Sequence, residues 1–87
     1  MSFSKPIIFS SHAQEKMIDR GASEEEVRLA ICAGKPEPAR KKRVAFRKNF
    51  SFDKKWRGKH YAAKQVVPIV SQGEDKFVVV TVFVYYF

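Results

Sequence analysis

The sequence contains one cysteine, two histidines and four isolated glycines among 87 residues. A single cysteine cannot form a disulfide within the chain, and its place in an apolar helical run predicts a buried thiol in a reducing compartment. The histidines lie at positions 12 and 60 and the cysteine at 32, which is not a metal-ligand spacing. No glycine-rich phosphate loop occurs. These absences predict a protein that works without a metal or a cofactor.

Long apolar runs are also missing. The longest extends from Phe77 to Phe87, is interrupted by Thr81 and is too short for a membrane helix. The first residues contain no apolar stretch of the length that a signal peptide needs. Since 45% of the residues are hydrophobic, we expect one small globular domain over residues 1–87, cytoplasmic and without a membrane partner.

Acidic residues are scarce where the bases gather. Residues 35–64 hold twelve Lys and Arg against two acids, a net charge of +10 in a chain whose net charge is +8. Such a localised field attracts polyanions, and aromatic faces beside cations suit stacked bases. Five aromatic residues lie within this segment: Phe46, Phe50, Phe52, Trp56 and Tyr61. The pattern favours RNA or another nucleic acid as partner; the alternative is a solvated basic surface with the aromatics in the core.

The first part of the chain predicts two short helices. Ser11 opens a capping box for a helix over residues 12–20, and Gly21 supplies the left-handed residue with which helices commonly end. Ser23 begins a second box and a second helix, which ends at residue 34. Three glutamates follow Ser23, and the helix dipole favours acids in a first turn.

After Pro38 the apolar period changes to two. Residues 43–50 and 60–70 are predicted strands separated by a polar loop, and residues 76–87 form a third strand, apolar on both faces and therefore central or covered on both sides. Pro68 removes a ladder donor, so an edge, a bulge or a strand end is expected there. The predicted fold class is α+β: two short N-terminal helices packed on a three-stranded, or four-stranded, curved antiparallel sheet.

Several polar side chains are candidates for a site. A helical wheel places His12, Lys16 and Arg20 on one ridge at the border of the apolar stripe of the first helix. Lys64 shares a strand face with apolar residues and either extends to the sheet edge or points into a site. Thr81 is the one polar residue on its strand face. For each of them a purely structural role is the alternative.

Two segments carry a family motif. Residues 9–27 contain His-Ala, Arg-Gly and Glu-Glu-Val in the family's order, and Val79-Val-Thr-Val82 follows near the end. In these features the chain resembles the bacterial domain-of-unknown-function family 4258. Lys16 stands where that family usually has Arg, and Ala22 replaces the usual Ile. The family is thought similar to RelE/ParE-type toxins of the microbial ribonuclease-like superfamily, so the resemblance implies a RelE/ParE-like fold and a metal-independent ribonuclease.

Two functions are therefore expected. The first is a toxin-like endoribonuclease that cleaves RNA through attack by the ribose 2′-hydroxyl, with His12 as general base or acid. In this hypothesis Arg20, Lys64 and Arg47 stabilise the transition state, and Thr81 orients a phosphate oxygen. The second is a non-catalytic basic module that binds nucleic acid or an acidic protein partner. The predicted nucleic-acid contacts are Lys16, Arg43, Arg47, Lys54, Lys55, Trp56 and Arg57.

Further partners stay open at this point. An acidic antitoxin-like protein would add a strand at the open sheet edge expected beside Pro68, a ParE-like target is another choice, and a homodimer is compatible with the sequence. The ribonuclease hypothesis depends on one geometric condition: the imidazole of His12 and the cations of the middle hairpin must face a common anion-binding hollow.

Overall fold

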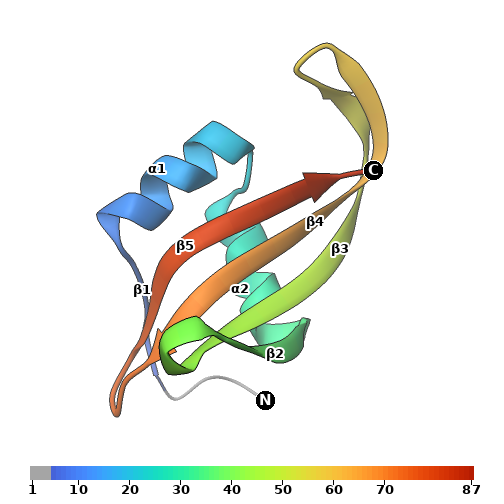
Figure 1. Ribbon diagram of the computed structural model, residues 1–87. Coiled ribbons are helices and arrows are strands. Elements are labelled where there is room, and N and C mark those ends of the chain that lie inside the picture. The colour runs from blue at the N-terminus through green and yellow to red at the C-terminus, as the bar shows by residue number, and fades with distance from the viewer. Residues whose placement is uncertain (1–4) are drawn as a thin grey trace.

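Five strands form one sheet, with two helices packed against it. The computed structural model describes residues 5–87. The elements are β1 (Ile7–Phe9), α1 (Ser11–Arg20), α2 (Glu24–Ala33), β2 (Lys35–Ala39), the short 3-10 turn η1 (Arg40–Lys42), β3 (Arg43–Trp56), β4 (Lys59–Gln72) and β5 (Phe77–Tyr86). The strand order is β1-β5-β4-β3-β2 (Figure 1).

The predicted RelE/ParE-like arrangement, two N-terminal helices on a three-stranded or four-stranded antiparallel sheet, is wrong. The sheet has five strands and is mixed, because β1 precedes the helices and pairs parallel to β5. At the other edge β2 pairs antiparallel to β3. Neither strand is among the predicted ones. β1 has only three residues, and β2 contains Pro36 and Pro38, which a sheet tolerates at an edge.

The central hairpin is longer than predicted. β3 and β4 have 14 residues each, so most of the expected polar loop is strand, and the chain turns at Arg57 and Gly58, where φ is positive. The pairing shifts between Ser51 and Lys54, at a bulge where Asp53 has φ 48°. Because bulges bend strands, the hairpin tip curls back toward the C-terminal end of α1 (Figure 1).

The predicted ends of both helices are confirmed, except that the N-cap of α1 lies one residue earlier than predicted. Ser10, not Ser11, caps α1: its side chain accepts a hydrogen bond from the backbone N–H of Ala13. Gly21 ends α1 in the left-handed conformation with φ 79°. The Ser23–Glu26 capping box of α2 is present in both directions. Local sequence therefore determines where the connection between the helices begins and ends.

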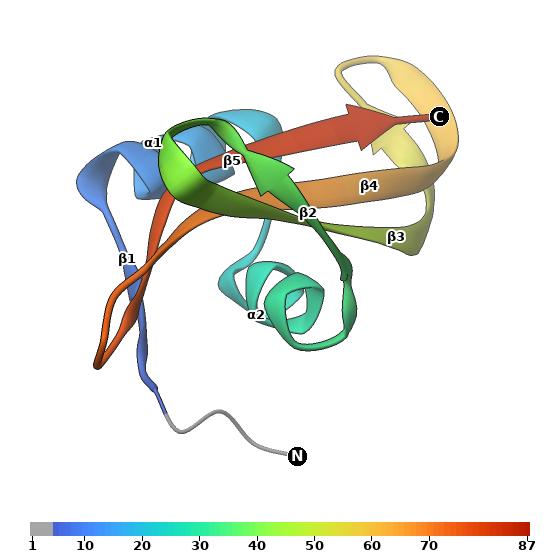
Figure 2. The ribbon, with the colours of Figure 1, turned by 60° about the horizontal axis from the view of Figure 1, so that its bottom comes forward.

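The helices cover one face and one edge of the sheet. α2 packs on β3 and β4, and α1 packs along β5. We call the face covered by α2 the back face; within residues 5–87 neither α1 nor α2 covers the opposite, front face, and η1 lies over it (Figure 2). The core lies between the back face and the helices and consists of Ala13, Met17, Ala22, Val27, Ile31, Val66, Val70, Val79 and Val82. Cys32, predicted to be buried, is exposed because Ile31 takes the inward position of α2.

Of the edge, bulge or strand end expected at Pro68, the structure has a bulge: the β4–β5 pairing shifts between Ile69 and Val70, and Pro68 lies in the middle of the sheet. It is buried in β4, which pairs with β5 on one side and β3 on the other. The sheet adapts in two ways: Val80 is an extra residue in the β4–β5 pairing, and the β3–β4 pairs skip from Ala45 to Lys48, where Pro68 has no N–H to donate. The open edge predicted beside Pro68 for a partner strand is therefore absent.

Gly21 gives a test of how closely the hairpin approaches the helix connection. A Cβ at Gly21 would lie 2.5 Å from the hydroxyl of Tyr86 and 2.8 Å from the ring of Trp56. At Gly58, where φ is also positive (86°), a Cβ would meet nothing within 4 Å. Gly58→Ala carries only the backbone cost of about 1–2 kcal/mol, whereas Gly21→Ala should lower the unfolding free energy by clearly more. Urea denaturation of both variants measures the difference; equal losses would contradict the close approach.

Candidate nucleic-acid interface

Two neighbouring hollows lie along β5. The hairpin hollow, about 390 Å³, lies between the hairpin tip, the end of α1 and the outer edge of β5. It is lined by Asp19, Arg20, Trp56, Arg57, Phe83, Val84 and Tyr86. The turn hollow, about 260 Å³, lies beside η1 and is lined by Ala39, Arg40, Arg43, Ile69, Thr81 and Phe83. Phe83 lines both, so the two hollows are adjacent.

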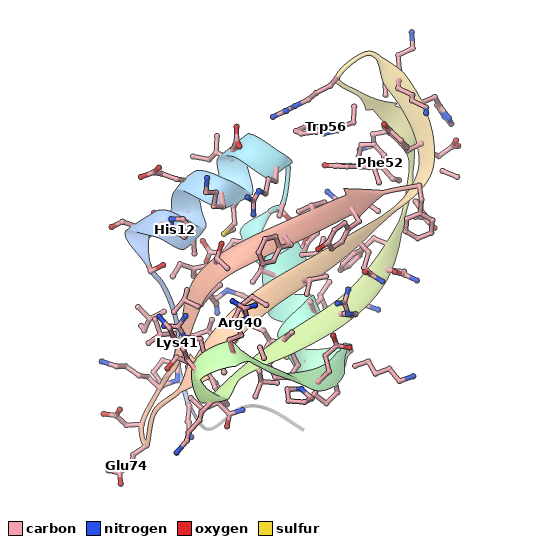
Figure 3. The ribbon with its side chains drawn as sticks, in the orientation of Figure 1. His12, Arg40, Lys41, Phe52, Trp56 and Glu74 are labelled. Atoms are coloured by element: carbon pink, nitrogen blue, oxygen red, sulfur yellow. The ribbon has the colours of Figure 1, made fainter. Side chains whose placement is uncertain are left out.

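Each hollow contains two arginines. Arg20 and Arg57 belong to the hairpin hollow, and Arg40 and Arg43 to the turn hollow. Figure 3 shows Arg40 over the front of the sheet and Trp56 at the hairpin end. Among the residues that the structure describes, Arg40 and Arg43 have no acidic partner. Their guanidinium groups are therefore available to an anion from solution.

Arg20 is held where the edge of β5 would otherwise be unpaired. Its Nη1 donates a hydrogen bond to the backbone carbonyl of Val82 over 2.9 Å, because β1 pairs only with the first residues of β5. The same guanidinium lies 5.0 Å from the centre of the Phe83 ring. A guanidinium has five N–H donors, so most of them remain for a ligand.

Arg57 is partly engaged by an acid. Its Nη2 donates to the backbone carbonyl of Asp19 over 2.6 Å and lies 3.5 Å from the carboxylate of the same residue. Both side chains are largely exposed, so this ion pair is weak in water. This contact holds the hairpin tip against α1. Arg57 can give up the Asp19 carboxylate for an anion that binds it more strongly.

Trp56, predicted as a stacking platform, packs against the protein. Its ring stacks on Tyr86 with centroids 5.1 Å apart and an angle of 16° between the planes. Phe52 and Tyr61 also contact the Tyr86 ring, and the Tyr86 hydroxyl donates to the carbonyl of Arg20 over 2.8 Å. Trp56 therefore forms a wall of the hairpin hollow and anchors the hairpin.

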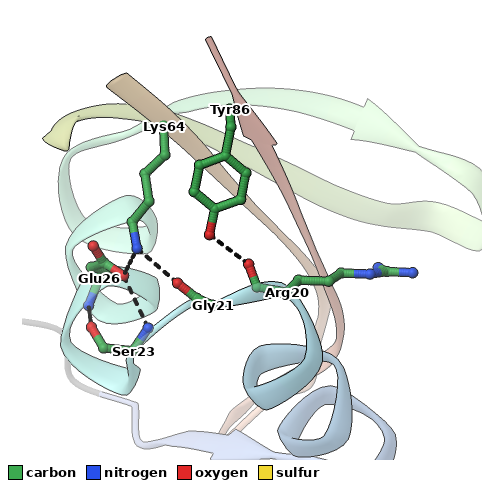
Figure 4. A network of polar contacts seen from close by, with 6 residues as sticks. All are labelled: Arg20, Gly21, Ser23, Glu26, Lys64 and Tyr86. Atoms are coloured by element: carbon green, nitrogen blue, oxygen red, sulfur yellow. Dashed lines mark hydrogen bonds and ion pairs between the residues drawn. The ribbon is translucent and has the colours of Figure 1, made fainter. Parts of the chain in front are cut away.

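Lys64 lies on the back face and lines neither hollow. Its side chain is only 7% exposed, and Nζ lies 2.8 Å from the Glu26 carboxylate. The same ammonium donates to the Gly21 carbonyl over 2.7 Å. Figure 4 shows how these contacts join β4 to the start of α2 and the connection after α1. A buried ammonium needs such partners, and here all of them are internal.

His12 and Lys16 lie away from both hollows. His12 is exposed in the first turn of α1, and within residues 5–87 its imidazole has no hydrogen bond or ion pair. It precedes Arg20 by eight residues, about 12 Å along the helix axis, and Figure 3 shows it at the far end of α1 from Trp56. Lys16 lines a third depression, of about 450 Å³, with Glu15, Ile18 and Asp19; it adjoins the hairpin hollow at Asp19, but Lys16 itself lines neither hollow. The structure thus does not bring the imidazole to the hairpin cations.

The remaining predicted residues divide between the hollows and their surroundings. Thr81 and Arg43 line the turn hollow. Arg47 pairs with Glu37 over 2.9 Å and donates to Gln65 over 3.0 Å. Lys54 and Lys55 are exposed on the hairpin outside the hollows. The structure therefore gathers five of the predicted site residues: Arg20, Arg43, Trp56, Arg57 and Thr81.

The sequence interpretation did not single out Arg40 and Phe83, which line the hollows, or the exposed Tyr85, which follows Phe83 on the same face of β5. The strand over residues 76–87 was expected to be central or covered on both sides; β5 is not an edge strand, yet Phe83 is 38% and Tyr85 50% exposed. Neither α1 nor α2 covers its front face. The alternation of Thr81, Phe83 and Tyr85 was the available signal, and it does not reveal which face α2 leaves open.

The turn beside the second hollow has an unusual backbone. Lys41 and Lys42 both have φ 60°, and Arg57 in the hairpin turn has φ 52°. Residues with a Cβ pay of order 1 kcal/mol or more for this conformation. Three of the four non-glycine residues with positive φ in residues 5–87 are basic. Strain that holds charged side chains at turns is more common at binding sites than elsewhere.

Burial of the Tyr86 phenol gives an alkaline test of the hairpin anchor. Burial first, and then the Glu26 carboxylate, raise the pKa of Tyr86 above 10.0, although Arg57 opposes them. The neutral phenol is thus favoured in the folded state, so its contribution to stability is complete below about pH 10 and is lost as the pH rises toward the raised folded value. Wild type should lose more unfolding free energy between pH 9 and about pH 11 than Tyr86→Phe. Denaturant titrations at both pH values measure this, and equal losses would contradict it.

Removal of the Lys64 ammonium tests its structural role. Lys64→Met removes the ammonium from the Glu26 carboxylate, which keeps only the Ser23 N–H, and from the Gly21 carbonyl, and we expect a loss of about 2–4 kcal/mol in the unfolding free energy. Adding Glu26→Gln should restore part of it. Lys54→Met, at an exposed position, is the control and should change stability by less than about 0.5 kcal/mol. A Lys64→Met protein as stable as this control would refute the role.

The fold and the hollows define a small basic domain with two helices on a mixed sheet. A family model described as "Domain of unknown function (DUF4258)" matches residues 9–84. The chain therefore belongs to this family, which confirms the family resemblance seen in the sequence. No curated protein and no solved structure matches the chain significantly.

Two further features are absent from the described residues, a metal-binding cluster and a membrane-spanning helix. Within residues 5–87, no three His, Cys, Asp or Glu side chains come together as a metal site would require. Neither α1 nor α2, the helices of that same range, has the length and apolar character needed to cross a membrane.

Proposed function

We propose that this protein binds nucleic acid through the two hollows along β5 and acts without a catalytic step. The observation that carries the proposal is the convergence of four arginines on two adjoining hollows that share one exposed aromatic ring. Arginine matches phosphate oxygens with a planar fork of donors, and aromatic rings beside cations suit bases. Both parts of a nucleotide therefore find a counterpart on one surface.

The charge distribution supports the same partner. Residues 35–64 carry a net charge of +10, and they supply Arg40, Arg43 and Arg57 to the hollows. The one acid that lines either hollow, Asp19, is paired with Arg57. A field of this kind attracts a polyanion over distances set by the salt concentration.

An acidic protein, including an antitoxin-like partner, is the competing choice. It would use the same arginines, but it would leave the exposed ring between the hollows without a matching group. Competition between an oligonucleotide and a poly-glutamate peptide for the purified protein separates the two. The proposal expects the oligonucleotide to bind more tightly at equal charge, and tighter binding of the peptide would reject it.

Salt dependence gives a quantitative test of the arginines. Binding of a fluorescent single-stranded oligonucleotide should weaken linearly in a plot of log K against log salt, with a slope of about 0.7 per phosphate contacted. Arg40→Gln and Arg43→Gln should each weaken binding and reduce that slope by roughly one contact.

The control for this titration is Arg28→Gln. Arg28 is a guanidinium on α2 that pairs with Glu24, and α2 covers the opposite face of the sheet. Its loss changes the net charge equally and should leave the slope unchanged. If Arg28→Gln and Arg43→Gln reduce the slope alike, binding has no defined site and the proposal fails.

RNA cleavage by a RelE/ParE-like toxin stays a prediction. It needs a proton acceptor beside the bound phosphate, and His12 lies at the other end of α1 from Arg20. Incubation of RNA, with and without ribosomes, with wild type and His12→Ala decides the matter. Cleavage by wild type that His12→Ala abolishes would replace the non-catalytic proposal with the enzymatic one.

A further inference from the structure

We propose that Phe83, together with the Arg20 guanidinium that covers one face of its ring, separates two successive bases of a single strand, so that one base occupies the hairpin hollow and the next occupies the turn hollow. This inference rests on the proposed nucleic-acid binding and specifies its ligand as single-stranded. Phe83 is the residue common to both hollows, lies on the front face of β5 and is 38% exposed as a residue. A strand that crosses β5 there must pass the ring.

The size of each hollow suits one base. A water molecule occupies about 30 Å³ in the liquid, so even the turn hollow, at about 260 Å³, has the volume of several waters. A pyrimidine base has eight or nine non-hydrogen atoms and a purine base ten or eleven. The hairpin hollow is larger, at about 390 Å³, and accommodates the larger base more easily.

The lining of the turn hollow fits a planar, largely apolar body with an anion at its rim. Ala39, Ile69 and the ring of Phe83 supply apolar walls. Arg40 and Arg43 lie at the same hollow without an acidic partner among the described residues. A base would contact the walls while its phosphate meets the guanidinium groups, which is how cationic grooves with aromatic surfaces hold single strands.

The hairpin hollow offers a different surface to the neighbouring base. The Arg20 guanidinium lies over the Phe83 ring, 5.0 Å from its centre, and is fixed there by its bond to the Val82 carbonyl. Guanidinium planes stack on bases as aromatic rings do. Asp19 supplies a carboxylate that can accept hydrogen bonds from a base edge, and Arg57 lies beside it.

This arrangement selects single strands over duplexes. In a duplex the bases are paired and stacked on one another, whereas a strand that places successive bases on opposite sides of Phe83 must have them separated. A duplex could reach the arginines only with its phosphates. Single strands should therefore bind more tightly than duplexes of the same sequence and charge.

The experiment uses an eight-nucleotide strand with two adjacent 2-aminopurines at its centre, free or paired with its complement. Adjacent 2-aminopurines stack and give an exciton signal in circular dichroism, which disappears when a side chain separates them. Wild type should bind the single strand at least about tenfold more tightly than the duplex and abolish the signal. Phe83→Ala should weaken single-strand binding by about tenfold, weaken duplex binding clearly less and preserve the signal.

Two further variants separate stacking from folding. Phe83→Tyr retains the ring and should restore wild-type binding, whereas Phe83→Leu retains apolar bulk and should behave as Phe83→Ala does. Thermal denaturation of each variant checks that it is folded. Single-strand affinity and exciton signal unaffected by Phe83→Ala would overturn the separation of the bases while leaving the electrostatic binding in place. If wild type binds neither strand nor duplex at low salt, the proposed function itself is refuted.

Discussion

The buried ammonium of Lys64 is the constraint on which the rest of the molecule depends. It joins the middle of the sheet to the Glu26 carboxylate and the Gly21 carbonyl and so fixes the connection between α1 and α2. That connection sets the end of α1, from which Arg20 reaches the edge of β5. It also presents the Arg20 carbonyl to Tyr86, on which the hairpin is stacked. One internal charge thus determines the walls of the hairpin hollow.

Aromatic and basic residues have two separate roles in this chain. Trp56 and Tyr86 pack on each other and hold the hairpin in place, whereas Phe83 and Tyr85 leave much of their surface to solvent. Among the basic residues, Lys64 and Arg47 donate hydrogen bonds to other groups of the protein. The side chains that the hollows offer to a ligand come from the end of α1, from η1 and the start of β3, from the hairpin turn and from β5. Composition alone does not distinguish the residues that pack within the protein from those exposed to a ligand, because both kinds occur in one basic, aromatic segment.

The sequence predicted those features whose interacting residues lie close together along the chain, and it did not predict those that depend on distant residues. The ends of both helices were predictable because Ser23, Glu26 and Gly21 act within a few residues of one another. The sheet was not, because β1 pairs with a strand about 70 residues later and β2 has no apolar alternation. The two hollows form only because distant parts of the chain come together, and they are lined by Arg20, Arg43, Thr81 and Phe83. The burial of Lys64 depends on distant contacts too. The sequence had left open whether its side chain extends to the sheet edge or points into a site.

The two prolines of β2 have a consequence for how the protein behaves when crowded. Pro36 and Pro38 are two residues apart in the outermost strand, so their backbone nitrogens point toward the same edge. Neither nitrogen has a hydrogen to donate to a neighbouring chain. This margin of the sheet therefore makes a poor template for fibril growth. A cationic protein that collects in many copies on one long polymer can reach high local concentrations there without its sheets joining side to side.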